Sequence, residues 1–457
     1  MATEYGDVLT FVQHLAPTWR KTQQRMLEET MVALLERPTL CESEIARGLP
    51  PGLGAREPAS LHGRLKRLSR FLGNPRLDEE GLWRRCSLLS CRFGEDWPSS
   101  ESGEGILPLL MDTTYFEPFA ALTIGVPCGS RGLTIALSTY HRHSLLAATP
   151  QPSARPRYWD SQNRIEENLL DYVLGRLAPG VRAVVVADAG FARASLLRHL
   201  LERGCHFVIR FDADTHVTLP DGRSGEAQAI LALAPGQSRF LPQAYYGKEA
   251  RVPLAVLGLW QVGQEEPWYL ATSLDRAELV ACLYRWRMRI EAGYRDDKSG
   301  VICRQGGDTH RLSSLVHLHR LLMACLCLHW LLALVGLQAH TTLPQGDQAP
   351  GQSALETAPP DSEPTAALIR QGPAMPPAPL PHRGPTPPLP QWMKRFAVRG
   401  HLSYVRLGLE VLRAPDLVTL LRRLVHWLGI YLWPFAPAWS KRQLRYRRQH
   451  WWPTPAS

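Results

Sequence analysis

The feature that most constrains the fold is a run of β-branched residues, Arg182–Ala187 (RAVVVA), that ends directly before Asp188. An apolar run without polar alternation is typical of a strand buried on both faces, as in parallel sheets covered by helices. Amphipathic helical patterns flank this run at Arg164–Leu177 and Ala192–Glu202, and Cys205–Arg210 has the pattern of a further strand. The alternation predicts a mixed α/β core.

A second acidic residue follows an apolar run earlier in the chain. Ile106–Met111 is a short strand pattern that ends before Asp112, and Ala120–Val126 and Leu133–Tyr140 are predicted to be the next two strands. The ends of strands are where an α/β core presents its functional groups. Asp112 and Asp188 are therefore candidate site residues.

Four polar residues downstream share one face of a predicted helix over Asp275–Lys298. They are Tyr284, Arg287, Glu291 and Lys298, spaced Tyr-x₂-Arg-x₃-Glu-x₆-Lys. At about 100° per residue, all four project within roughly 60° of arc. One stripe that holds an acid, two cations and a phenol indicates a shared ligand.

This spacing is similar to the motif of the insertion-sequence-four family of bacterial transposases. Asp112 in MDTT resembles the family's first acid, Asp188 in ADAGF its second and Glu291 its third. The resemblance extends in order from about residue 20 to residue 335. The chain departs from the family at Ala189, where Arg is usual, at Met288, where some relatives have Trp, and in its Pro-rich linker.

The resemblance implies an RNase H-like core and a DDE transposase, which cleaves the ends of a mobile element and joins them to target DNA. Phosphoryl transfer on DNA is served by two Mg²⁺ ions about 3.5–4 Å apart, and Mg²⁺ prefers carboxylate oxygens. We expect Asp112, Asp188 and Glu291 to hold both ions, which Mn²⁺ can replace. We expect Tyr284, Arg287 and Lys298 to bind DNA phosphates. The alternative role for Arg287 is an intrahelical pair with Glu291.

Residues 212–274 contain short runs between Gly and Pro turns, among them Thr215–Leu219, Arg251–Leu259 and Trp268–Thr272, and are predicted to form a mostly β insertion. In relatives that cut and paste, a flipped base stacks on a Trp of this insertion. Trp260 and Trp268 are the candidates here, because a flipped base needs an aromatic platform. The alternative is that either one packs in the core of the insertion.

The N-terminal hundred residues have helical patterns at Arg20–Leu35, at Cys41–Arg47 and at Ser60–Leu72, where Ser60 is the expected cap. The last of these helices interleaves cations with apolar residues, which is compatible with a DNA-reading helix. Its candidate DNA-binding residues are Arg64, Lys66, Arg67 and Arg70. The alternative is the solvated face of an ordinary helical domain.

Composition divides the remainder of the chain. Leu321–Leu337 is very apolar, and its length favours a buried core helix over a membrane span. Residues 341–390 contain fourteen prolines, which predicts a disordered linker. The predicted organisation is a helical DNA-binding domain (1–105), two parts of an RNase H-like core (106–211 and 275–340) around the insertion (212–274), the linker (341–390), and a basic helical C-terminal region (391–457).

The whole net charge of +10 lies in residues 391–457, which hold twelve Lys and Arg and two Asp and Glu. A basic segment on a neutral body suggests a polyanionic partner, and we expect double-stranded DNA, both element ends and target, and no membrane. Cleavage at two ends predicts a homodimer. Nine scattered cysteines and an N-terminus without an apolar segment predict a cytoplasmic protein, in the bacterial cytosol or nucleoid.

Two other functions remain open at this point. The first is an inactive relative that only occupies element ends, and the second is another RNase H-like nuclease that acts on hybrids or junctions. The intact set of three acids argues against the first alternative. The basic N-terminal helix and the β insertion argue against the second.

Overall fold

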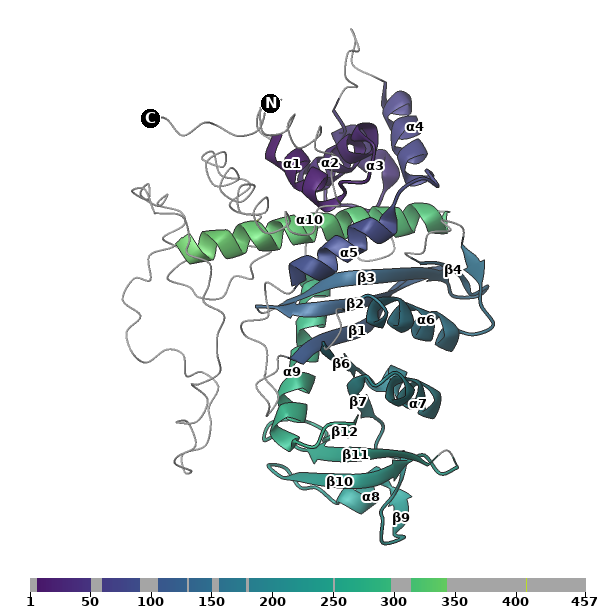
Figure 1. Cartoon of the computed structure of the whole chain (residues 1–457), viewed down its shortest axis with the longest axis vertical. Helices are drawn as coiled ribbons and strands as arrows, with labels where there is room; N and C mark the ends of the chain where they lie inside the picture. Colours follow the sequence, from purple (N-terminus) through teal and green to yellow (C-terminus); the bar gives the residue numbers. More distant parts are fainter. Residues whose placement is uncertain are drawn as a thin grey trace, which may run out of the picture.

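The computed structural model describes residues 6–50, 60–90, 106–129, 131–149, 156–177, 181–249, 251–296 and 314–342, together with Gly408. Five helices come first, a large sheet with its helices follows, and a long helix closes the described chain (Figure 1). The predicted linker over residues 341–390 and basic region over residues 391–457 lie almost entirely outside the described residues.

One twelve-stranded mixed sheet runs through the molecule in the order β5-β4-β3-β2-β1-β6-β7-β12-β11-β10-β8-β9. The strands up to β7 are β1 (Ile106–Phe116), β2 (Phe119–Cys128), β3 (Arg131–His141), β4 (Leu146–Ala148), β5 (Arg157–Tyr158), β6 (Arg182–Ala187) and β7 (His206–Phe211). The later strands are β8 (His216–Thr218), β9 (Ser224–Glu226), β10 (Ser238–Tyr246), β11 (Val252–Leu259) and β12 (Trp268–Thr272).

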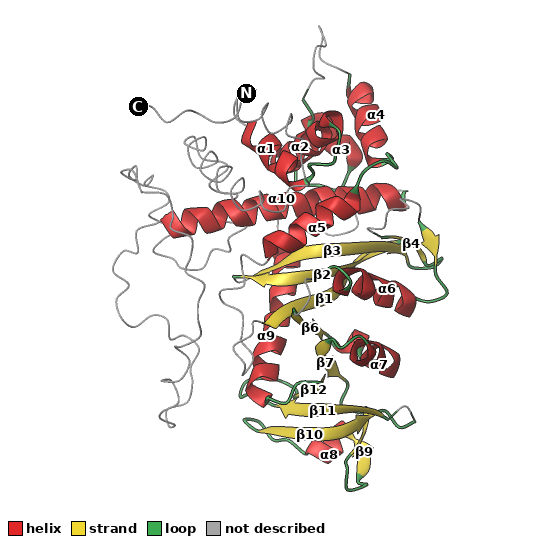
Figure 2. Ribbon diagram, in the orientation of Figure 1, coloured by secondary structure: helices red, strands yellow, loops and turns green. Residues whose placement is uncertain are grey.

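The middle of the sheet is parallel and is covered on both faces. β6 lies between β1 and β7 and pairs with each in parallel, as the run of valines predicts. The helices α6 (Gln162–Leu174) and α7 (Ala194–Glu202) pack on one face, and α9 (Ala277–Asp296) crosses the other (Figure 2). The mixed α/β core is therefore confirmed.

One predicted strand end was wrong. β1 does not end before Asp112 but continues to Phe116, because the residues after Asp112 keep pairing with β2, where Asp112 lies opposite Thr123. The strands of the predicted β insertion extend the core sheet, because β12 pairs with β7. The extension also includes β9, β10 and the short helix α8 (Ala227–Leu231), which no sequence pattern indicated.

The N-terminal helices are α1 (Gly6–Leu15), α2 (Lys21–Glu36), α3 (Glu42–Gly48), α4 (Leu61–Leu72) and α5 (Glu79–Ser90). The three predicted from sequence are confirmed as α2, α3 and α4. The predicted cap is also present, since the Ser60 hydroxyl accepts a hydrogen bond from the Gly63 amide at 3.2 Å. These helices share one continuous apolar core with a face of the sheet.

The long helix α10 (Leu315–Thr342) lies between the N-terminal helices and β3 (Figure 1). Leu315–Leu337 is long and apolar enough to cross a membrane, but 83% of its most apolar window is buried inside the protein. Its composition is therefore accounted for by packing, as expected for a core helix.

A buried polar cluster fixes α10 to both of its neighbours. Glu79 of α5 accepts hydrogen bonds from Arg320 Nε at 2.8 Å and contacts His319 Nε2 at 3.1 Å. The other ring nitrogen of His319 meets Thr139 of β3 at 3.1 Å, and Arg320 also donates to the carbonyl of Leu72 at 2.6 Å. Burial alone would raise the pKa of Glu79, but the charges and hydrogen bonds of His319 and Arg320 outweigh it and lower that pKa.

Candidate active site

The two strand aspartates stand at the same level on neighbouring parallel strands. The last parallel pair of β1 and β6 joins Leu110 to Val186, and Asp112 and Asp188 each lie two residues beyond it. Because side chains alternate between the two faces of a strand, Asp112 points to the same face of β1 as Leu110. Leu110 packs against α9 on that face. The register thus brings the two predicted acids together at one edge of the parallel strands.

Backbone amides orient both carboxylates. Asp112 Oδ1 accepts from the amide of Thr113 at 2.8 Å, and Asp188 Oδ1 accepts from the amide of Gly190 at 3.0 Å. Both residues are partly exposed, so solvent and ligands can reach them. Each acid therefore has one oxygen fixed by the fold, at a position open to a ligand.

Helix α9 places Tyr284 near Asp188, and Arg287 lies against Tyr284. Burial raises the pKa of Tyr284; the cations Arg287 and Arg210 oppose that rise, and the charge of Asp188 adds to it. The guanidinium of Arg287 lies 5.7 Å from the centroid of the Tyr284 ring. Tyr284 itself is only 2% exposed, so the phenol lies beneath the surface, with the Arg287 cation near its ring.

The other two residues of the predicted stripe are less completely described. Glu291 belongs to α9, but its side chain is outside the described part of the chain, as is all of Lys298. The neighbouring Ile290 backbone lies against Gly132 of β3, where a Cβ would meet the Ile290 Cα at 3.1 Å. This contact fixes the height of α9 above the sheet at the turn that carries Glu291.

Arg210 lies at the same level of the sheet as Asp112 and Asp188, and it was not identified from the sequence. The pairing of β6 with β7 sets Ala187 opposite Ile209, so Arg210 follows immediately after that pair as Asp188 does. Arg210 forms an ion pair with Glu266 from the loop before β12. The signal that could have found it is a cation near the end of the strand next to Asp188, but its neighbours depend on a register that only the structure provides.

The donor chemistry suits a divalent hard cation, since carboxylate oxygens are the ligands that Mg²⁺ prefers. Among the described side chains, however, no three His, Cys, Asp or Glu residues come together as a metal site. The described part of the predicted triad consists of Asp112 and Asp188. Those two carboxylates have the donor chemistry of a metal site, and Glu291 on α9 stays a prediction as the third acid.

The basic helix α4 separates its cations into two sets. Arg64 donates to the carbonyls of Arg47 and Leu49, both at 3.1 Å, and Arg67 donates to the carbonyl of Pro50 at 2.7 Å. His62, Lys66 and Arg70 on the same helix are exposed and are spaced four residues apart. Two of the four predicted DNA-binding residues therefore tie the end of α3 to α4, and the other two share one exposed face.

The two candidate tryptophans lie in different surroundings. Trp268, at the start of β12, packs edge-on against Tyr284 with ring centroids 4.9 Å apart. Trp260 lies in the turn after β11, where its indole N–H donates to the carbonyl of Gln264 at 3.1 Å. Trp268 adjoins the site, whereas the described contacts of Trp260 stabilise a turn.

Comparison with known proteins gives one family. No curated protein matches the chain. Residues 145–331 match the family model described as the transposase DDE domain. The match contains Asp188, Tyr284, Arg287 and Glu291 and begins after Asp112. Its RNase H-like fold agrees with the mixed sheet. Residues 145–331 are therefore similar to a transposase DDE domain, which supports a DDE transposase.

Proposed function

We propose that the protein is a Mg²⁺-dependent DNA transposase that cleaves the ends of an insertion sequence and transfers them to target DNA. Within the DDE transposases we assign it to the insertion-sequence-four family, on the spacing of Tyr284, Arg287, Glu291 and Lys298. The observation that carries the proposal is the placement of Asp112 and Asp188 at the same level of two neighbouring parallel strands, with Tyr284 of α9 near Asp188 and Arg287 against Tyr284.

Three acids would hold two metal ions in this proposal. The amide contacts of Asp112 and Asp188 orient their carboxylates before any ligand arrives, and Glu291 would approach from α9. When bound, Mg²⁺ ions activate the attacking water or 3′-hydroxyl and relieve charge on the leaving oxygen. Mn²⁺ has similar preferences for oxygen ligands and is expected to substitute.

The cations of the stripe would hold the DNA backbone at Asp112 and Asp188. Arg287 can grip two phosphate oxygens because its guanidinium presents a planar fork of donors, and Lys298 would act as a second cation. Tyr284 is buried beneath Arg287, so we assign it to the support of Arg287 at the phosphate. The indole of Trp268 borders the same residues and is the better placed candidate for stacking on a flipped base.

Recognition of the element end is assigned to the exposed face of α4. Lys66 and Arg70 lie on that face and would contact DNA, whereas Arg64 and Arg67 are held in contacts to the segment after α3. A homodimer that joins two ends would supply the two active sites that paired cleavage requires. Such a protein would act in the bacterial cytosol or nucleoid.

The test is cleavage of a duplex that carries the inverted repeats flanking the coding sequence. Asp112→Ala, Asp188→Ala and Glu291→Ala should each abolish Mg²⁺-dependent cleavage and leave DNA binding largely intact, because affinity comes from phosphate contacts by cations. Asp221→Ala is the matched control, since Asp221 is an acid in an exposed turn.

The outcomes separate the alternatives. Binding of the duplex without cleavage by the wild-type protein would favour an inactive relative. Preference for RNA–DNA hybrid over duplex would favour another RNase H-like nuclease. Near wild-type cleavage by one of the three alanine variants would remove that acid from the site.

The α4 assignment has a separate test. Lys66→Ala with Arg70→Ala should weaken binding of the element end and leave the melting temperature unchanged. Arg64→Ala with Arg67→Ala should lower the melting temperature, because both side chains hold the backbone after α3 and Arg67 also pairs with Glu29 at 3.1 Å. Equal loss of binding in the two double variants at equal stability would contradict this division of roles.

A further inference from the structure

The loop after Asp188 is held from two sides before it enters α7. Its one-turn 3₁₀ helix, Ala189–Phe191, begins at Asp188 and buries the Phe191 ring. On one side, the Tyr246 hydroxyl of β10 donates to the carbonyl of Ala192 at 2.7 Å. On the other, Arg193 reaches across to α6. The position of Asp188 therefore depends on contacts that its own strand does not make.

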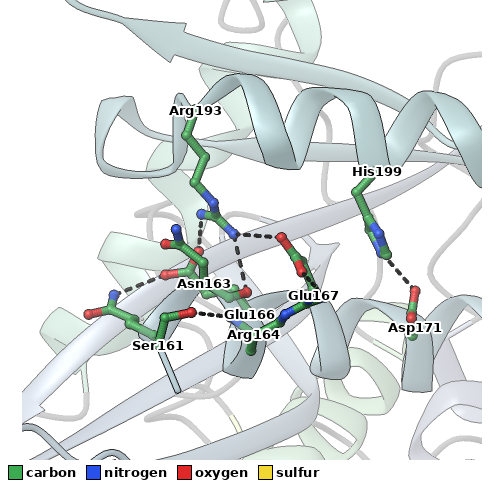
Figure 3. Close-up of polar contacts among 9 residues, drawn as sticks. Ser161, Asn163, Arg164, Glu166, Glu167, Asp171, Arg193 and His199 are labelled. Atoms are coloured by element: carbon green, nitrogen blue, oxygen red, sulfur yellow. Dashed lines mark hydrogen bonds and ion pairs between the residues drawn. The ribbon is translucent and has the colours of Figure 1, made fainter. Parts of the chain in front are cut away.

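Arg193 meets three groups on α6 (Figure 3). It forms an ion pair with Glu166, a longer one with Glu167 at 3.7 Å, and donates to the carbonyl of Asn163 at 3.3 Å. The side chain of Glu166 is only 3% exposed, and that of Arg193 19%. Such a contact is part of the interior of the protein and is little affected by salt in solution.

The carboxylate of Glu166 is costly to bury and is kept in place by its partners. Burial raises its pKa, while Arg193 opposes the rise, together with Gln162, which donates to Glu166 at 2.9 Å. Removal of one member of a buried pair leaves the other uncompensated. The arrangement thus favours one geometry of Arg193, and with it one path for the five residues that follow Asp188.

We propose that Arg193 is a positioning residue of the metal site, which acts by fixing the Asp188 loop to α6 through Glu166. This inference rests on the proposed function, in which Asp188 holds metal. Groups that orient metal ligands from behind typically change metal affinity or activity by about 10–100-fold when they are removed. Arg193 lies at the first residue before α7, so a shift of its backbone is passed directly to the 3₁₀ turn.

The chain offers a matched control on the same two helices. Arg203, at the other end of α7, pairs with Asp171 of α6 at 2.6 Å, well along the helix from the Asp188 loop. Arg203→Met removes an arginine–carboxylate contact between α6 and α7 without touching that loop. Arg193→Met removes the contact beside the loop. The double variant Arg193→Met, Glu166→Gln leaves no buried charge alone and is therefore expected to fold.

The experiment measures Mn²⁺ binding by electron paramagnetic resonance on the full chain, with thermal melting and Mg²⁺-dependent cleavage measured in parallel. Arg193→Met and the double variant should bind Mn²⁺ at least about tenfold more weakly and require correspondingly more Mg²⁺ for cleavage. Arg203→Met should match the wild type in both. The double variant should be no worse than Arg193→Met, because both changes break one contact.

Several results would overturn the inference. They are wild-type Mn²⁺ affinity in the folded double variant, equal losses in Arg203→Met, or a double variant that fails to fold, which would assign Arg193 to stability alone. A wild-type protein that binds Mn²⁺ and cleaves DNA, with unaffected Arg193 variants, overturns only this inference. A wild-type protein that does neither overturns the proposed function together with it.

Discussion

The change Gly132→Ala tests whether the close approach of α9 to β3 matters for chemistry. A Cβ at residue 132 would lie 3.1 Å from the Cα of Ile290 and 3.3 Å from its backbone nitrogen. Carbon atoms pack best at about 3.5–4.0 Å, so α9 has to rise by roughly half an ångström or the strand has to bend. The nearest atoms are the Cα, nitrogen and Cβ of Ile290, whose positions no change of side-chain rotamer can alter.

The expected effects on stability and on rate are of similar size in free energy, since a tenfold change in rate corresponds to about 1.4 kcal/mol. Overpacking of this kind costs about 1–3 kcal/mol. Misplacement of a catalytic group by about 1 Å can cost about 10²-fold in rate, so half that shift beside Glu291 should reduce cleavage by about tenfold. The measurement is the single-turnover rate of Mg²⁺-dependent cleavage, with the melting temperature recorded on the same samples.

Gly225→Ala is the control for this prediction. At Gly225 a Cβ would meet only side-chain atoms of Ile230, at 3.7 and 3.8 Å, which is ordinary contact. That variant should retain both rate and stability. A Gly132→Ala protein with wild-type cleavage would refute the argument, as would equal losses in the two variants.

Three further predictions concern charge, pH and the C-terminal region. Arg287→Ala and Lys298→Ala should each lower the log–log salt slope of DNA binding by about one unit, and unchanged slopes would favour the intrahelical pair of Arg287 with Glu291. Burial raises the pKa of Glu28 to about 7 from 4.5, so its contribution to stability is present below pH 4.5 and lost as pH rises through about 7. Glu28→Gln should therefore raise the melting temperature at pH 8.5 and leave it unchanged at pH 4, and no difference at pH 8.5 would contradict this. Deletion of residues 391–457 should leave a folded core that binds single ends but assembles paired-end complexes poorly, as seen by gel mobility, and normal pairing would reduce the segment to a nonspecific DNA contact.

The sequence was sufficient for elements whose pattern is local. The valine run predicts β6, because a strand that is buried on both faces is apolar at successive positions and does not alternate with polar residues. Helix α4 follows from its periodicity and its Ser60 cap. Asp112 and Asp188 could be predicted as site residues because each follows an apolar run. These features depend on residues that lie within a few positions of one another.

The remaining features depend on contacts between distant segments. β10 (SRFLPQAYY) mixes polar and apolar residues without regular alternation, and its pairing with β11 contains a register shift. Arg210 lies beside Asp188 because of the register between β6 and β7, and this register cannot be predicted from spacing in the sequence. The contacts of Arg64 and Arg67 with backbone carbonyls after α3 could not be predicted, because backbone acceptors leave no side-chain pattern in the sequence.

The cluster around Glu79 has a consequence for how this chain can change over time. Arg320 of α10 donates to Glu79 of the N-terminal helices, and the neighbouring His319 contacts β3. One apolar core includes all three parts. A gene fragment that ends near residue 105 would encode helices whose apolar faces have lost their cover. Exchange of the first hundred residues between relatives would require a matched exchange of α10, so the segments that encode the N-terminal helices and α10 are expected to be inherited together.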